Sequence, residues 1–142
     1  MTDTQQARSS VPSNCPPLEQ AVVQFIQDLK YEHIDAHAHA GINRLMRDQL
    51  AVQIGISKMP WSGQLLKYAT NQQRPGTSRV SASPLTMSAM DAAFVNGSYG
   101  HGFEYDDAHG PSYSHPGSCV IPAALATCSA PSARRNWIPS AA

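Results

Sequence analysis

The chain has 142 residues, a length that fits a single domain or part of one. Its ten basic and ten acidic residues cancel, so the composition gives no support for binding nucleic acid or an anionic membrane surface. Charged residues make up 14% of the chain, well below the ~25% that is usual for soluble domains. This shortage indicates a buried partner surface, a piece of a larger molecule, or simply a composition rich in small residues.

The three cysteines, Cys15, Cys119 and Cys128, contain no C-x-x-C pair, and their odd number gives no disulfide framework. Free thiols are typical of a reducing compartment. The longest apolar run, residues 119–126, is too short to span a bilayer. Residues 1–17 lack the apolar core of a signal peptide. We therefore expect a soluble cytoplasmic protein that does not contact membranes.

The first half of the chain predicts helices after a disordered start. Residues 1–17 are polar and without periodicity, so we expect them to be disordered. A first amphipathic helix is predicted by apolar residues at helical spacing, namely Val22, Phe25, Ile26 and Leu29. A second helix is predicted over residues 35–54, with Gly55 as a natural stop. A third, shorter helix is predicted over residues 63–70.

The second half also predicts helices, separated by loops. Residues 72–83 suggest a loop or a weak strand, after which Ser83-Pro84 opens a helical stretch that continues to Val95. A further helix is predicted around residues 122–126. No run alternates with period two, so we expect a mainly α fold.

Chemically active side chains crowd into one stretch, residues 91–125, which holds three of the six histidines and four of the ten acidic residues. Carboxylates beside imidazoles set the tautomer of histidine, which general acid–base catalysis near neutral pH requires. The helix that follows His115-Pro116 would present free N–H groups near Gly117 and Ser118, suited to a substrate carboxylate. The alternative is a polar loop with incidental histidines.

Two further observations limit this candidate site. Its histidines and aspartates match no zinc spacing, and H-E-x-x-H is absent, so we predict no metal. No lysine or arginine lies between Val80 and Ala133, so fixed cations for an acidic substrate must come from elsewhere. A second histidine group, within residues 32–39, is interpreted as a solvated helix face without function.

The motifs of this stretch together resemble the signature of the MmgE/PrpD family. The matching motifs are Asp91-Ala-Ala-Phe-Val-Asn96-Gly97, His101, Glu104-Tyr-Asp106-Asp107-Ala-His109, His115-Pro116-Gly and Pro122-Ala-Ala-Leu-Ala. Upstream, residues 29–35 look like the N-terminal opening of the family. The family includes 2-methylcitrate dehydratase, an enzyme of propionate catabolism, as well as cis-aconitate decarboxylase and iminodisuccinate epimerase. The resemblance covers residues 18–127, which would form part of a helical N-terminal domain.

The resemblance implies an all-helical main domain, a homodimer and chemistry without a metal or an organic cofactor. Family members abstract a proton next to a carboxylate of a small di- or tricarboxylate, with elimination, decarboxylation or epimerisation. By position, His115 corresponds to an active-site histidine, and Glu104 falls where many members carry aspartate. The predicted catalytic residues are therefore His115, Glu104 and Asp107. The predicted substrate-binding residues are His101, Asp106, His109, Gly117 and Ser118.

The chain also departs from the family, whose members are much longer and bring lysines to the site from later sequence. After Thr127 the composition changes abruptly, and Pro131 and Pro139 interrupt any helix. We expect residues 128–142 to be a disordered tail foreign to the family, and the chain to be a truncated product that is inactive alone. The alternatives are a non-catalytic helical fragment that associates with a full-length paralogue, and a small metal-binding protein.

Overall fold

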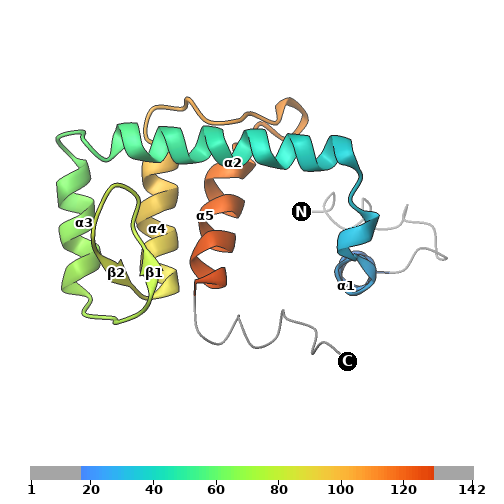
Figure 1. Cartoon of the computed structure of the whole chain (residues 1–142), viewed down its shortest axis with the longest axis horizontal. Coiled ribbons are helices and arrows are strands. Elements are labelled where there is room, and N and C mark those ends of the chain that lie inside the picture. Colours follow the sequence, from blue (N-terminus) through green and yellow to red (C-terminus); the bar gives the residue numbers. More distant parts are fainter. Residues whose placement is uncertain (1–16, 130–142) are drawn as a thin grey trace, which may run out of the picture. The chain divides into compact units, whose positions relative to one another are not determined.

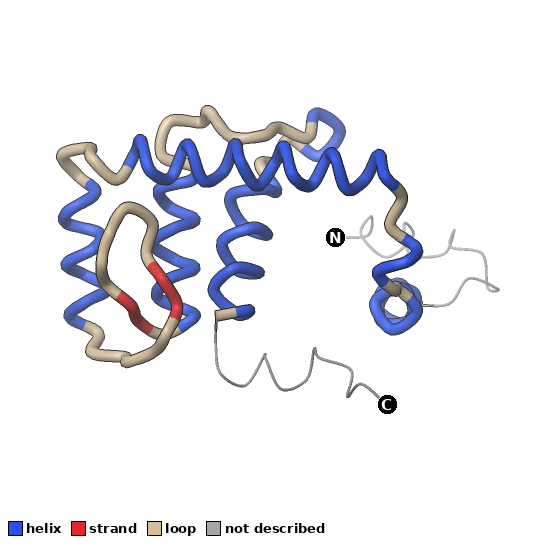
Figure 2. Tube along the Cα trace, in the orientation of Figure 1, coloured by secondary structure: helices blue, strands red, loops and turns tan. Residues whose placement is uncertain are grey.

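The computed structural model describes residues 17–129, and the mainly α fold predicted from the sequence is confirmed there (Figure 1). The two strands in this range, β1 (Ser78–Arg79) and β2 (Thr86–Met87), are two residues long and pair antiparallel (Figure 2). The predicted disordered start and foreign tail lie almost entirely outside the described residues. Within that range, no helix combines the length and the apolar character needed to cross a membrane.

The chain divides into two compact units, and the first ends at Ala38. Its described part holds α1 (Leu18–Asp28) and a 3₁₀ turn, η2 (Tyr31–His33). The predicted first helix is therefore confirmed, but none of its residues is buried, and Phe25 keeps 65% of its surface exposed. Asp35 starts the next helix, because its Oδ1 accepts a hydrogen bond from the N–H of Ala38 at 2.7 Å.

The second unit, from His39 onward, contains the remaining elements. Three helices lie side by side, and the part of α2 in this unit crosses one end of them (Figure 1). The helices are α2 (Ala36–Ile56), α3 (Ser62–Asn71), α4 (Ala89–Gly100) and α5 (Pro116–Cys128), with a 3₁₀ turn, η3 (Gly110–Ser112), before α5. The predicted second and third helices correspond to α2 and α3. The predicted end of the second helix, at residue 54 before Gly55, is two residues early, because α2 continues through Ile56.

A small apolar core joins these elements. Its buried members are Ile56, Ala69, Val80, Met87, Ala92, Val95, Tyr99 and Ala126. Trp61 packs its ring edge-on against Tyr99, with the ring centroids 6.4 Å apart. Burial of apolar surface contributes roughly 25 cal/mol per Å², so a core this small leaves the unit dependent on its buried polar contacts as well.

The start of α4 corrects one prediction, since the helix begins at Ala89 and not at Ser83-Pro84. The earlier residues form a turn, in which the Ser83 N–H donates to the carbonyl of Val80. The helix begins where it does because the side chain of Ser88 accepts a hydrogen bond from the N–H of Asp91 at 3.1 Å. The buried carboxylate of Asp91 is in turn held by the guanidinium of Arg74, at 2.5 and 2.9 Å.

The start of α5 is held by a side chain from the preceding loop. His115 is the N-cap residue and Pro116 occupies the first helical position, where a missing N–H costs nothing. The Oδ1 of Asp107 accepts a hydrogen bond from the Gly117 N–H at 2.9 Å. A carboxylate at this end also interacts favourably with the helix dipole. The loop between α4 and α5 is therefore tied to the helix that it precedes.

The first prediction concerns Tyr99, whose hydroxyl donates to the carbonyl of Ser62 at 3.2 Å. Burial raises the pKa of Tyr99 above its ordinary value of 10.0, so above pH 10 the unfolded chain releases this proton more readily than the folded chain does. The free energy of unfolding therefore falls as the pH rises past 10. We expect Tyr99→Phe to lower the free energy of unfolding by about 1 kcal/mol at neutral pH. The free energy of unfolding of this variant should also fall less steeply above pH 10.

Urea denaturation of both proteins across this pH range measures the difference. Tyr113→Phe is the matched control, because Tyr113 is 96% exposed. Equal alkaline slopes for the wild-type chain and Tyr99→Phe would contradict the prediction.

The second prediction concerns the cap of α5. Asp107→Ala removes the acceptor for the Gly117 N–H and should lower the free energy of unfolding by about 1 kcal/mol. Asp107→Asn keeps an acceptor oxygen in the side chain and should lower the free energy of unfolding by a smaller amount. Thermal and urea unfolding check both values. Glu104→Ala, at an exposed residue of the same loop, is the control. An Asp107→Ala chain as stable as the wild type would show that the contact does not hold the helix.

Candidate functional site

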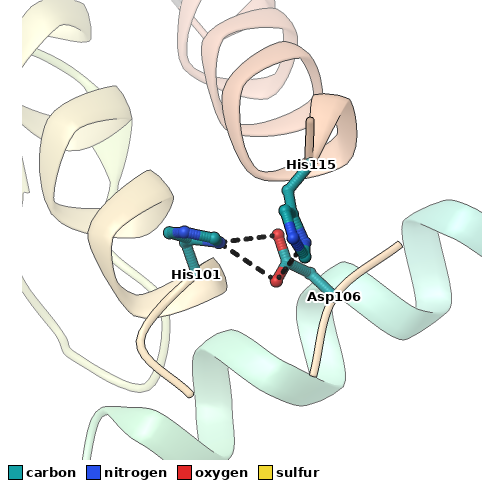
Figure 3. Close-up of side chains that lie close together, drawn as sticks. All are labelled: His101, Asp106 and His115. Carbon is teal, nitrogen blue, oxygen red and sulfur yellow. Dashed lines mark hydrogen bonds and ion pairs between the residues drawn. The ribbon is translucent and has the colours of Figure 1, made fainter. Parts of the chain in front are cut away.

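The structure brings three of the predicted residues together where α4 ends and α5 begins (Figure 3). His101 follows the last residue of α4 as its C-cap, and His115 precedes the first residue of α5 as its N-cap. Asp106 lies in the loop between them, and its carboxylate points between the two imidazole rings (Figure 3). Two helix ends and one loop thus fix the three side chains.

Distances within this group, which we call the His–Asp–His cluster, are short. The Nδ1 atom of His101 lies 3.2 and 3.3 Å from the two carboxylate oxygens of Asp106. The Nδ1 atom of His115 lies 3.3 Å from Oδ1 of Asp106. The two imidazole centroids are 4.8 Å apart, with their planes inclined by 60°. Because an ionised carboxylate only accepts hydrogen bonds, Nδ1 of His101 carries a proton when Asp106 is charged.

The second imidazole is held less completely than the first. Although Nδ1 of His115 is close to Asp106, it is enclosed and makes no hydrogen bond to any described residue. The two atoms are close enough for an ion pair, but a hydrogen bond between them would be bent, and hydrogen bonds weaken steeply when bent. An enclosed polar atom without a partner costs about 1–3 kcal/mol, and such atoms concentrate where a protein binds or reacts.

Within residues 17–129, the carboxylate at the centre of the cluster forms no ion pair with a lysine or arginine. The side chain of Asp106 is fully buried, while those of His101 and His115 are 45% and 28% exposed. No lysine or arginine occurs from residue 81 to residue 133. The imidazoles are thus the groups positioned to stabilise the carboxylate, which they do best when protonated. The same three groups offer donor atoms within 4.8 Å of one another, so they are also the described residues that fit a metal ion.

A buried polar network supports the His101 end of the cluster. The side-chain amide of Gln49 donates to the carbonyl of Gly100 at 3.3 Å, and its oxygen accepts from Gln53 at 3.1 Å. A Cβ at Gly100 would lie 2.1 Å from Oε1 of Gln49, so any larger residue would displace this buried side chain. Sequence reasoning missed Gln49 and Gln53, since a glutamine within a helix carries no signal that it is buried.

The other predicted site residues lie outside the cluster. Glu104 is exposed, has a left-handed backbone with φ of 54°, and its side chain makes no hydrogen bond or ion pair within residues 17–129. His109 is exposed and its Nδ1 pairs with the hydroxyl of Ser112 at 2.6 Å. We expected the N–H of Gly117 to be free for a substrate, but it donates to Asp107, which caps α5. The hydroxyl of Ser118 donates to the carbonyl of His115 at 2.8 Å.

An apolar groove of about 400 Å³ begins beside the cluster and runs between α2 and α5. Asp107, Pro116 and Gly117 line its end nearest the cluster. The remaining walls are almost wholly aliphatic and comprise Ile42, Leu45, Met46, Val120, Ile121, Ala124 and Leu125. Ile42, Leu45 and Met46 of α2 contribute one wall, so these apolar side chains face a groove and not a packed core.

Comparison with family models gives one match, the MmgE/PrpD N-terminal domain, over residues 20–138. Comparisons with curated proteins and with solved structures gave no significant match. The matched range includes α2 to α5 and every member of the His–Asp–His cluster, and it continues past residue 127. Since the match covers most of the chain, the chain belongs to the MmgE/PrpD family and carries its N-terminal domain.

Proposed function

We propose that this chain takes part in proton abstraction and elimination on a small di- or tricarboxylate, as the N-terminal domain of a carbon–oxygen lyase of the 2-methylcitrate dehydratase type. The observation that carries the proposal is the buried carboxylate of Asp106 between the imidazoles of His101 and His115, in a chain of this family. The proposal includes a homodimer for the complete member, a cytoplasmic location and a role in propionate catabolism. It includes no metal or organic cofactor for the reaction.

Elimination of water needs a base on one carbon and an acid for the leaving hydroxyl. In the proposed reaction His115 takes the proton from the carbon next to a substrate carboxylate, and Asp106 stabilises the imidazolium that forms. Because Nδ1 of His115 is enclosed against Asp106, the other ring nitrogen, Nε2, is left for the substrate. His101, which is more exposed, gives a proton to the departing hydroxyl, so that water leaves and a carbon–carbon double bond forms.

The carboxylate partner of His115 was predicted to be Glu104 or Asp107, and the geometry favours Asp106 for this role. Asp106 is 3.3 Å from Nδ1 of His115, whereas Asp107 is hydrogen-bonded to Gly117, and Glu104 forms no hydrogen bond or ion pair with either imidazole within residues 17–129. The catalytic roles of Glu104 and Asp107 stay predictions. Variants that separate charge from hydrogen bonding, such as Asp107→Asn, distinguish them from a capping role.

The cluster offers few groups that could bind the carboxylates of the substrate. The described part of the chain places no lysine or arginine at the cluster, and the first N–H groups of α5 are partly used by Asp107. Fixed cations strengthen carboxylate binding and stabilise negative charge that develops in the reaction. Without them we expect weak substrate binding and negligible turnover by this chain alone.

The third prediction tests the proposal through binding. Titration of the chain with 2-methylcitrate, followed by NMR of the histidine ring signals, should shift the signals of His101 and His115 and leave those of His33 and His109 in place. The reason is that only the first two rings flank the proposed site. Asp106→Asn should reduce the shifts of both rings, and Asp48→Asn, at an exposed aspartate of α2, is the matched control.

Two outcomes count against this account. Equal shifts of all histidine signals, or no shift of any histidine signal at saturating ligand, would contradict the proposed site. Measurable dehydration of 2-methylcitrate by the purified chain would contradict the expectation that cations from elsewhere are required.

A second candidate function, association with a full-length paralogue without catalysis, is favoured by the apolar groove between α2 and α5. Val120 on its wall is 63% exposed, and the low charged fraction gives this face few groups that oppose burial. The occupant in this alternative is an apolar helix of the paralogue, since a groove of this lining suits one.

The fourth prediction separates the two functions by size-exclusion chromatography. Association predicts that the chain co-elutes with a complete 2-methylcitrate dehydratase-type protein, and that Val120→Asp abolishes the complex because a charge in an apolar contact is costly. Val23→Asp, on exposed α1, is the control. A monomer that melts cooperatively and never joins the larger protein would argue against association.

A further inference from the structure

We propose that the His–Asp–His cluster binds one divalent transition-metal ion, with Zn²⁺ as the ion it fits best. The ligands are Nδ1 of His101, a carboxylate oxygen of Asp106 and Nδ1 of His115. This property goes beyond the proposed reaction and does not depend on it. Two imidazoles and a carboxylate are a donor set that suits zinc and the neighbouring first-row metals.

The separations within the cluster match those of a zinc site. Zinc bonds to histidine nitrogen and carboxylate oxygen are about 2.0–2.2 Å long, so the donor atoms of a tetrahedral site lie about 3.4 Å apart. Oδ1 of Asp106 is 3.2 Å from Nδ1 of His101 and 3.3 Å from Nδ1 of His115. One donor atom from each of the three residues lies within 4.8 Å of the other two. A small rotation of the half-exposed His101 side chain would bring its nitrogen closer to that of His115.

The unpaired nitrogen of His115 is the observation that points to a ligand. This Nδ1 is enclosed and makes no hydrogen bond within residues 17–129, although it faces a carboxylate. A neutral imidazole with a lone pair at Nδ1 would repel the carboxylate oxygen, and one with a proton there donates at a poor angle. A metal ion bound to both atoms removes either problem, because it is an electron-pair acceptor for each of them.

Charge and access also favour a cation. The buried carboxylate of Asp106 pairs with no lysine or arginine of the described residues, so the entry of a divalent ion is not opposed by a paired fixed cation. The side chains of His101 and His115 are 45% and 28% exposed, so solvent reaches the cluster, and a water could complete the coordination as in zinc sites with three protein ligands. The sequence does not reveal this site because its ligands, at positions 101, 106 and 115, follow no known zinc spacing.

The fifth prediction uses the full chain, reduced and metal-free, titrated with Zn²⁺ by calorimetry and with Co²⁺ by visible absorption. We expect one ion per chain and a Co²⁺ spectrum without a thiolate band. His101→Ala, Asp106→Asn and His115→Ala should each raise the dissociation constant for Zn²⁺ at least tenfold. His109→Ala is the matched control, because that ring pairs only with Ser112 and should leave the constant unchanged.

A second measurement needs no variant, so it remains informative even if a substituted chain does not fold. In the wild-type chain labelled with ¹⁵N, Zn²⁺ should shift the Nδ1 signals of His101 and His115 and leave those of His33 and His109 in place. Absence of zinc binding would overturn the proposal. So would binding that survives loss of the three ligands, or that requires the exposed thiols Cys119 and Cys128 instead. A chain that binds Zn²⁺ here and ignores 2-methylcitrate would refute only the proposed reaction.

Discussion

The closeness of α4 and α5 is the constraint on which the rest of the site depends. A Cβ on Gly97 would lie 2.9 Å from the carbonyl oxygen of Ser118, so the two backbones meet where a side chain would not fit. Pro122 has no N–H to offer that carbonyl one turn later, which leaves the oxygen facing α4. His101 comes four residues after Gly97, and His115 three residues before Ser118. The contact therefore sets both imidazoles about one helical turn away from it, on the same side.

Once the imidazoles are fixed, the buried carboxylate between them decides the chemistry. Asp106 keeps a charge away from water with partners that are only partly basic. Positive charge nearby stabilises such a buried carboxylate, whether it comes from a proton on an imidazole or from a metal ion. The proposed proton transfer and the proposed zinc binding use the same two imidazoles and the same carboxylate, although His115 would meet the substrate through Nε2 and zinc through Nδ1. One excludes the other at any moment, and zinc would be expected to inhibit a reaction at this site.

The sequence predicts the helices well because their signals are local, and it predicts the site only in part because the site depends on the path of a loop. The apolar stripe of α1 and the periodicity of α2 are readable without a structure. The start of α4 was placed too early because Pro84 looks like a helix opener, while the cap is formed by Ser88 together with Asp91. Glu104, Asp106 and Asp107 are equally plausible by composition, and the left-handed turn at Glu104 is one feature of the loop path that separates them.

The most direct test of the central claim is whether the two imidazoles are neighbours in solution. Ring centroids 4.8 Å apart predict nuclear Overhauser cross-peaks between the ring protons of His101 and His115, and none from either ring to His109. Gly97→Val, which places a side chain between α4 and α5, should remove these cross-peaks. Well-resolved ring signals of the wild-type chain without a cross-peak between His101 and His115 would contradict the account.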